Sequence, residues 1–142
     1  MFMSNIKYTA LAAVACTALA VPASAEMVKY TADLTSNAEV PPTDSAATGT
    51  ADVTVDTEAK TVMWMVAVEG LTGDATAAHI HGPANEGENA GPVITMADTM
   101  MEGQAEITDD QISELEDGKY YVNIHTEKNP DGEIRGQLSK AE

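Results

Sequence analysis

The chain of 142 residues carries 7 basic and 23 acidic residues, which gives a formal net charge of −16. A charge this negative argues against nucleic acid or anionic lipid surfaces as partners, because both repel it. The single cysteine, Cys16, lies near the N-terminus, so the rest of the chain offers neither a disulfide nor a thiolate metal ligand. These features favour a small acidic domain that is stabilised by its apolar core.

The first 25 residues are typical of a secretory signal peptide. Lys7 supplies a positive charge, residues 8–21 are apolar and uncharged, and Ala23-Ser24-Ala25 fits the small-x-small pattern of a cleavage site. The apolar run is shorter than the about 20 residues that a membrane-spanning helix needs. We therefore expect residues 1–25 to be cleaved and the mature protein to be periplasmic or secreted, with no membrane attachment.

Lipidation of Cys16 is the alternative to cleavage after Ala25. The preceding segment, Ala13-Val14-Ala15, has an alanine where a lipidation box usually has a larger aliphatic residue, so we prefer cleavage. The remaining residues, 26–142, contain no repeat and no low-complexity segment. We expect them to form one domain.

Residues 27–34 and 48–56 alternate apolar with polar side chains, which is typical of strands with one buried face. Residues 61–71 are almost wholly apolar and predict a central strand. Residues 109–117 break the strand pattern and predict a short helix that ends at Gly118. The predicted strands cover residues 27–34, 48–56, 61–71, 75–81, 92–96, 103–108, 119–126 and 133–139.

This order of elements predicts an all-β fold. Short strands separated by loops rich in glycine, proline and asparagine indicate a single antiparallel, Greek-key-like β-sandwich or flattened barrel of seven or eight strands with one short helix. An α/β fold is not expected, because strands and helices do not alternate along the chain.

Two of the three histidines lie in the predicted strand 75–81. His79 and His81 are two residues apart, so on a strand both rings leave the same face. Ala78 and Ile80 then point to the other face, into the core. This register places two imidazoles where they can bind one ion.

The third histidine, His125, lies in the predicted strand 119–126. Val122 and Ile124 are the residues of this strand that face the core, so Tyr121, Asn123 and His125 lie on the opposite face. If the two strands are neighbours, three imidazoles converge, and such a set without thiolates suits zinc or copper. The alternative is that these are scattered surface histidines without a ligand.

Methionine is a soft ligand that selects Cu(I) over zinc. Met96, Met100 and Met101 border the loop of residues 97–99 and could supply an accessory copper shell. Met63 and Met65 lie in the most apolar strand, where packing in the core is the expected role.

Arg135 is the only arginine of the chain and shares a predicted strand face with Glu133 and Gln137. The simplest expectation is an ion pair with one of the many acids at a sheet edge. The functional alternative is a positive group near the metal that attracts an anion or a small oxidant.

Five ordered blocks of the chain resemble the CHRD domain, which is named for its occurrence in chordin and is widespread in exported bacterial proteins. The resemblance covers nearly all of residues 26–142, and in chordin the domain belongs to an extracellular binder of growth factors. The blocks are Asn37–Pro42, Ala47–Ala51, Ala78–Ala84, Tyr121–Thr126 and Gly132–Leu138.

The histidines and Arg135 are also similar to the copper half of copper/zinc superoxide dismutase. That similarity implies that His79, His81 and His125 are copper ligands and that Arg135 guides the anion, in a Greek-key β-barrel. The chain has no fourth histidine to bridge to zinc, no zinc loop and no cysteine pair. These departures argue against zinc-assisted dismutase chemistry, whereas the similarity stays compatible with a mononuclear copper site.

Three hypotheses follow from these patterns. The first is an exported protein that binds copper, with zinc as the alternative ion, through His79, His81 and His125, for metal handling or protection. The second is a copper-only enzyme similar to superoxide dismutase, with Arg135 attracting the anion. The third is an extracytoplasmic interaction module without metal and with an unidentified protein partner. We prefer the first.

Overall fold

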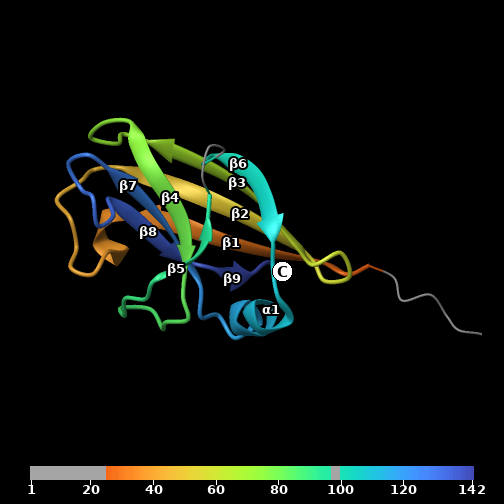
Figure 1. Ribbon diagram of the computed structural model, residues 1–142. Helices are drawn as coiled ribbons and strands as arrows, with labels where there is room; N and C mark the ends of the chain where they lie inside the picture. The colour runs from red at the N-terminus through yellow and green to blue at the C-terminus, as the bar shows by residue number, and fades with distance from the viewer. Residues whose placement is uncertain (1–24, 97–99) are drawn as a thin grey trace, which may run out of the picture.

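The computed structural model describes residues 25–96 and 100–142, which form a curved antiparallel sheet with one α-helix at its end (Figure 1). The predicted signal segment and Cys16 lie outside the described residues, apart from Ala25. The elements in chain order are β1 (Met27–Thr35), η1 (Ser36–Ala38), β2 (Thr48–Asp56), β3 (Thr61–Glu69), β4 (Ala75–His81), β5 (Pro92–Thr95), β6 (Glu102–Glu106), α1 (Asp109–Glu116), β7 (Tyr121–Thr126), β8 (Ile134–Gln137) and β9 (Ser139–Lys140).

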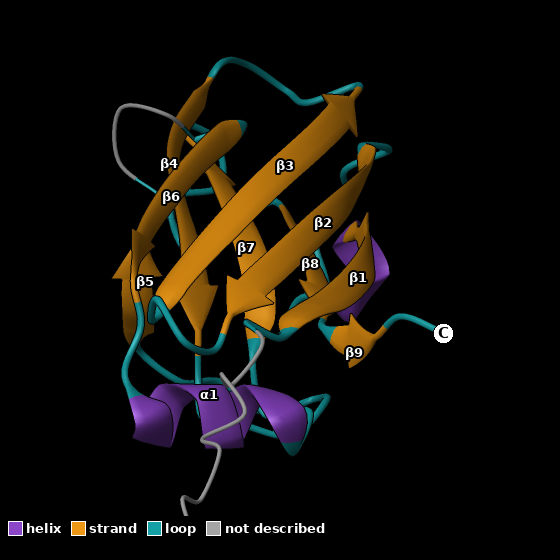
Figure 2. Ribbon diagram, turned by 90° about the vertical axis from the view of Figure 1, so that its right-hand side faces the viewer, coloured by secondary structure: helices purple, strands orange, loops and turns teal. Residues whose placement is uncertain are grey.

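The strands form one sheet in the order β5-β4-β7-β8-β1-β2-β3-β6, and the short β9 pairs with β1. All strand pairs are antiparallel, and the sheet curves until it is nearly closed into a barrel (Figure 2). The all-β prediction with one short helix is therefore confirmed. Contacts between strands distant in the chain, such as β8 with β1 and β3 with β6, hold the sheet together.

The predicted burial of the N-terminal strands is correct. In β1, Val28, Tyr30 and Ala32 are buried while the residues between them are exposed, and Val53 and Val55 of β2 are buried on the same side. Apolar side chains on these alternate positions pack into one core because successive residues of a strand point to opposite faces.

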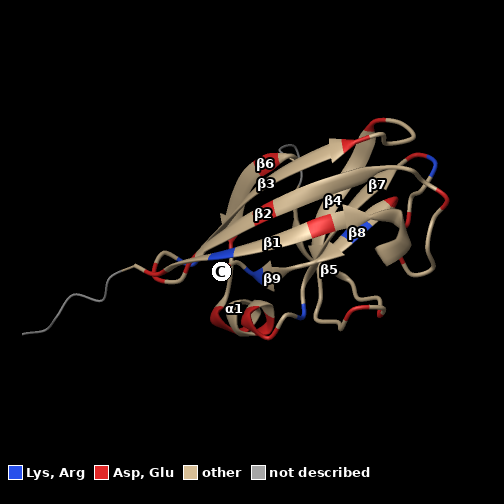
Figure 3. Ribbon diagram, turned by 180° about the vertical axis from the view of Figure 1, so that it is seen from behind, with Lys and Arg blue, Asp and Glu red and all other residues tan. Residues whose placement is uncertain are grey.

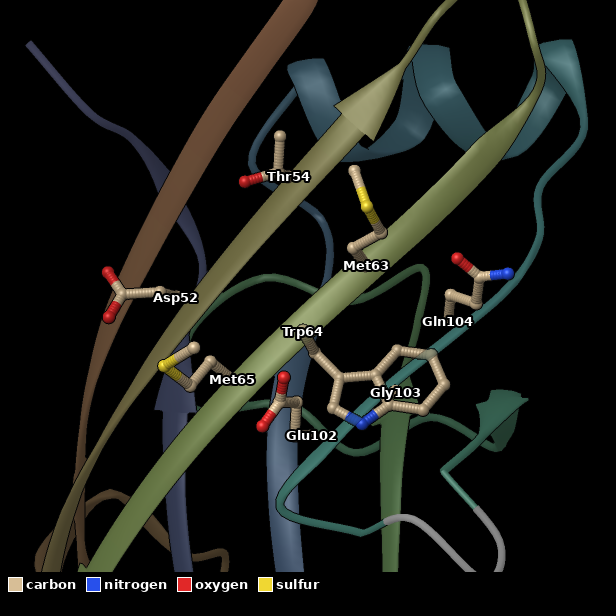
Figure 4. A pocket seen from close by; sticks show the side chains of 8 residues that line it. All are labelled: Asp52, Thr54, Met63, Trp64, Met65, Glu102, Gly103 and Gln104. Atoms are coloured by element: carbon tan, nitrogen blue, oxygen red, sulfur yellow. The ribbon is translucent and has the colours of Figure 1, made fainter.

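The apolar strand, β3, pairs with β2 and with β6 and so is not an edge strand, but it is not buried on both faces. β3 lies next to β6 at one end of the strand order, and its side chains alternate between core and surface. Trp64 is buried, whereas Met65 is 58 % exposed beside Asp52 on the outer face of the sheet (Figure 4). A strand of a nearly closed barrel faces the core on one side only, so its apolar run does not indicate burial on both faces.

Helix α1 begins and ends as predicted. The Thr108 hydroxyl accepts from the Gln111 backbone N–H, and the Gln111 side chain accepts from the Thr108 N–H, which together form a capping box. Gly118, at a φ of +71°, follows the helix in the left-handed conformation that glycine favours. Ile112 and Leu115 are buried, so α1 covers one end of the barrel (Figure 2).

Two details of the chain were not predicted. The strand expected over residues 133–139 is divided into β8 and β9, because Ser139 and Lys140 pair with Thr31 and Tyr30 of β1. The segment between the predicted strands 27–34 and 48–56 contains the 3-10 turn η1 and the buried Glu39. Both features depend on contacts with distant strands.

Acidic residues are spread over strands, loops and α1, and basic residues are few (Figure 3). Among the described residues, Lys60 and Asp109 form an ion pair. Within the same ranges, no helix combines the length and apolar character that crossing a membrane requires.

Candidate metal centre

Strands β4 and β7 are neighbours, and their register brings the three histidines together. His125 lies opposite Ala77, and His79 lies opposite Asn123. Ala78 and Ile80 of β4 are buried in the core, so His79 and His81 lie on the outer face of the strand. The expected convergence of three imidazoles on one face is therefore confirmed.

The three rings are close enough to hold one metal ion. One ring nitrogen from each histidine lies within 4.8 Å of the corresponding atoms of the other two. Nδ1 of His79 lies 3.1 Å from Nε2 of His125. The ring centres of His79 and His81 are 5.3 Å apart, and those of His81 and His125 are 5.8 Å apart.

Backbone carbonyls fix the orientation of two of the rings. Nδ1 of His81 lies 2.9 Å from the carbonyl oxygen of Ala90, and Nδ1 of His125 lies 2.9 Å from that of Pro130. A carbonyl only accepts, so in both histidines Nδ1 carries the hydrogen and Nε2 keeps its lone pair. In His81 this Nε2 is buried and has no hydrogen-bond partner in the part of the chain described. An unpaired buried lone pair beside two other imidazoles fits a metal ligand.

The surroundings of His79 and His81 favour the neutral forms of these two rings. Burial lowers the pKa of His79, and the nearby His125 lowers it further. Burial also lowers the pKa of His81, an effect that the Ala90 carbonyl opposes and that the charges of His79, His125 and Arg135 reinforce. Neutral imidazoles are the form that binds a metal.

Loops cover the face of β4, β7 and β8 that carries the histidines. His81 is 9 % exposed and His125 is 8 % exposed, whereas His79 is half-buried. The covering segments are residues 82–91, which contact His81, and residues 127–132, which contact His125. His81 and His125 are thus largely shielded from bulk water, and His79 is the most exposed of the three.

The model of one protein family, the CHRD domain, matches residues 30–138 of this chain. The chain belongs to the CHRD domain family. Comparison with curated proteins found no match, and comparison with solved structures found none. The matched range includes the three histidines and Arg135, so the candidate metal centre lies within the CHRD domain.

The methionines of the CHRD domain do not surround the histidines. Met96 is fully buried in the hydrophobic core, and Met100 and Met101 pack against that core. Met96 directly follows Thr95, the residue that pairs with His79. Because successive residues of a strand point to opposite faces, Met96 points away from the face that Thr95 shares with His79. The expectation of an accessory copper shell of methionines is therefore wrong, and residues 97–99 of that loop lie outside the described residues.

Arg135 does not form the expected ion pair at a sheet edge. Its strand, β8, lies between β7 and β1, and the side chain is 2 % exposed. The guanidinium carbon lies 3.5 Å from the centre of the Tyr121 ring, and the nitrogens donate to the carbonyl oxygen of Glu88 and to Oδ1 of Asn89. Among the described residues, Arg135 therefore contacts a ring and neutral oxygens.

Four buried polar residues near the histidines were not identified as site residues from the sequence: Tyr121, Asn123, Glu39 and Glu133. Strand alternation places Tyr121 and Asn123 on the face of His125, and this signal could have found them. Glu39 lies in a loop and hydrogen-bonds to Asn123 across 84 positions of sequence. No pattern in the sequence indicates that contact.

Proposed function

We propose that this CHRD domain is an exported copper-binding protein in which His79, His81 and His125 hold the ion, for metal handling or for protection against copper. The observation that carries the proposal is the convergence of three imidazoles, one of which, His81, has a buried Nε2 without a hydrogen-bond partner among the described residues. The signal-peptide pattern of residues 1–25 supports export to the periplasm or beyond it.

Copper is preferred over zinc because of the donor set. The three ligands are imidazoles, and the described chain has no cysteine to supply the thiolates common in structural zinc sites. For a given set of nitrogen ligands, divalent copper binds more tightly than divalent zinc. The negative surface charge also attracts cations of either kind toward the domain.

Binding is proposed here rather than dismutase activity. An anion-guiding arginine has to meet the anion, whereas the Arg135 guanidinium is buried against Tyr121 and the 82–91 loop. The contacts of Arg135 therefore give no support to an enzyme of that kind.

Copper titration tests the proposal directly. We expect the metal-free protein to bind one Cu(II) more tightly than Zn(II), and His79→Ala or His125→Ala to weaken copper binding by about 100-fold or more. Loss of a ligand should cost more than loss of its hydrogen-bond partners, which costs roughly 10- to 100-fold. Affinities are measured by competition with a chelator of known copper affinity.

The control for this titration is Glu102→Gln, which removes an exposed acid of β6 and none of the histidines. It should bind copper as the unchanged protein does. Equally weak binding by the unchanged protein and by the histidine variants would overturn the metal proposal and leave an interaction module. Tighter binding of zinc than of copper would overturn the choice of metal.

Export has its own test. When the full chain is expressed in a Gram-negative bacterium, the processed protein should be recovered in the periplasmic fraction with Glu26 as its first residue. Its mass should contain no lipid. A membrane-bound form that begins with a lipid-modified Cys16 would show that the alternative processing route is the correct one.

A further inference from the structure

The loop of residues 82–91 is tied to the outer face of the sheet by two side chains that lie beside the candidate metal centre. We infer that Tyr121 and Arg135 are positioning residues, which hold this loop so that its Ala90 carbonyl fixes His81 with Nε2 turned toward His79 and His125. The inference rests on the proposed function and adds how one ligand is oriented.

Tyr121 contacts both His81 and the residue that fixes it. The two rings stack with their centres 5.0 Å apart and an angle of 11° between their planes. The Tyr121 hydroxyl donates to the carbonyl oxygen of Ala90 at 3.0 Å and accepts from the Ala90 N–H at 3.1 Å. The same carbonyl oxygen accepts from Nδ1 of His81 at 2.9 Å. Tyr121 thus places the acceptor and limits the tilt of the imidazole.

Arg135 contacts the loop at the two residues that precede Ala90, and it does not hydrogen-bond to His81 itself. Its guanidinium lies over the Tyr121 ring and donates to the carbonyl oxygen of Glu88 at 2.7 Å and to Oδ1 of Asn89 at 3.1 Å. Because β7 lies between β4 and β8, His81 and Arg135 approach the Tyr121 ring from strands on its two sides. The two hydrogen bonds fix the loop just before Ala90, and the cation–π contact holds the guanidinium against the Tyr121 ring.

Other contacts hold the two ends of the loop. The Gly82 N–H bonds to the Gly91 carbonyl oxygen, and the Ala84 N–H bonds to that of Lys119. Nε2 of Gln137 donates to the Ala84 carbonyl oxygen as well. Removal of one contact of Tyr121 or Arg135 should therefore disturb the Ala90 carbonyl locally while the loop and the barrel remain folded.

The chemical consequence concerns the tautomer of His81. While the Ala90 carbonyl accepts from Nδ1, the hydrogen stays on Nδ1 and the Nε2 lone pair is free for a metal. If that carbonyl moves away, the hydrogen can reside on Nε2 and the ring can turn, and both changes remove the ligand. The stack and the tethered loop therefore act on metal affinity through His81.

The test compares the full chain, as processed by the expression host, with Tyr121→Phe and Arg135→Lys. Tyr121→Phe keeps the ring stack and loses both hydrogen bonds to Ala90. Arg135→Lys keeps the positive charge and loses the planar guanidinium that bonds to Glu88 and Asn89 at once. We expect each variant to bind Cu(II) about 10-fold more weakly and to change the copper electron paramagnetic resonance spectrum. In metal-free protein we expect ¹⁵N NMR to show more His81 with its hydrogen on Nε2.

A matched control is Tyr30→Phe, because the buried Tyr30 hydroxyl in the core has no hydrogen-bond partner among the described residues. It should leave affinity, spectrum and tautomer unchanged. If Arg135→Lys fails to fold, Tyr121→Phe by itself still tests whether the loop positions His81. Unchanged affinity, spectrum and tautomer in that variant would overturn the inference while the copper proposal stands. Failure of the unchanged protein to bind copper would overturn the proposed function instead, and the tautomer measurement would still test the positioning.

Discussion

Replacing Glu133 by glutamine is expected to lower the free energy of unfolding at pH 7 by about 3 kcal/mol, the largest loss that we predict for one side chain. The Glu133 carboxylate is 0 % exposed. It accepts hydrogen bonds from the hydroxyls of Ser45, Thr72 and Thr126, from the Thr72 N–H and from Nδ2 of Asn129. A glutamine amide would present hydrogens to some of these donors and leave them unpaired.

The pH dependence identifies the charge of Glu133 as the cause. Burial alone would raise the pKa of Glu133, but the hydrogen bonds from Ser45, Thr126 and Thr72 lower it to about 2, from an ordinary value of 4.5. The folded state then binds its proton less readily than the unfolded state does. The stabilisation is therefore fully present above pH 4.5 and is lost as the pH falls from 4.5 to 2.

Urea unfolding of the metal-free protein at several pH values measures this effect. The difference between the unchanged protein and Glu133→Gln should shrink as the pH is lowered from 7 toward 2. Glu69→Gln, which alters an exposed acid at the end of β3, is the control and should differ little at any pH. A Glu133→Gln loss that stays the same across this range would contradict the electrostatic explanation.

The strand faces were predictable because apolar and polar residues alternate along a strand that has one buried face. Val28 and Val53 mark the core side of β1 and β2, and the same alternation placed His125 on the outer face of β7. The two-residue spacing of His79 and His81 likewise fixes a shared face. For these residues the local pattern and the fold agree, so no knowledge of distant contacts was needed.

What covers the histidine face was not predictable in the same way. Every residue of β7 is buried, although alternation assigns half of them to the outer face. Their burial comes from loops that cross the sheet, through contacts such as Arg135 with Glu88 and Glu39 with Asn123. These contacts join positions far apart in the chain, and nothing local in the sequence marks them. For the same reason the buried setting of Arg135 was missed.

Two buried glutamates, Glu133 and Glu39, differ in the number of hydrogen-bond donors around their carboxyl groups. Glu133 accepts from several donors, whereas Glu39, at 6 % exposure, accepts one bond from Nδ2 of Asn123 at 3.2 Å. Oε1 of Glu39 and Oδ1 of Asn123 are both buried acceptors without a partner among the described residues. A hydrogen on Glu39 would satisfy both acceptors at once, so the neutral acid fits this position better than the carboxylate.

Glu39→Gln is therefore expected to stabilise the protein at pH 8 by up to about 3 kcal/mol. Burial raises the pKa of Glu39 to about 7, although the Asn123 hydrogen bond and the charge of Arg135 lower it in part. The stability that depends on the bound proton is fully present below pH 4.5 and is lost as the pH rises from 4.5 to 7. Glutamine is neutral at every pH and can pair with both atoms of the Asn123 amide, so it avoids this loss.

Urea unfolding of metal-free protein at pH 8 and pH 4 decides the point. Glu39→Gln should be more stable than the unchanged protein at pH 8 and close to it at pH 4. Glu133→Gln is the matched comparison, because the same substitution at that position should destabilise at pH 8. If Glu39→Gln also lost stability at pH 8, Glu39 would have to be a carboxylate with a donor that the described contacts do not include. The opposite signs of the two variants follow from the number of donors around each carboxyl group.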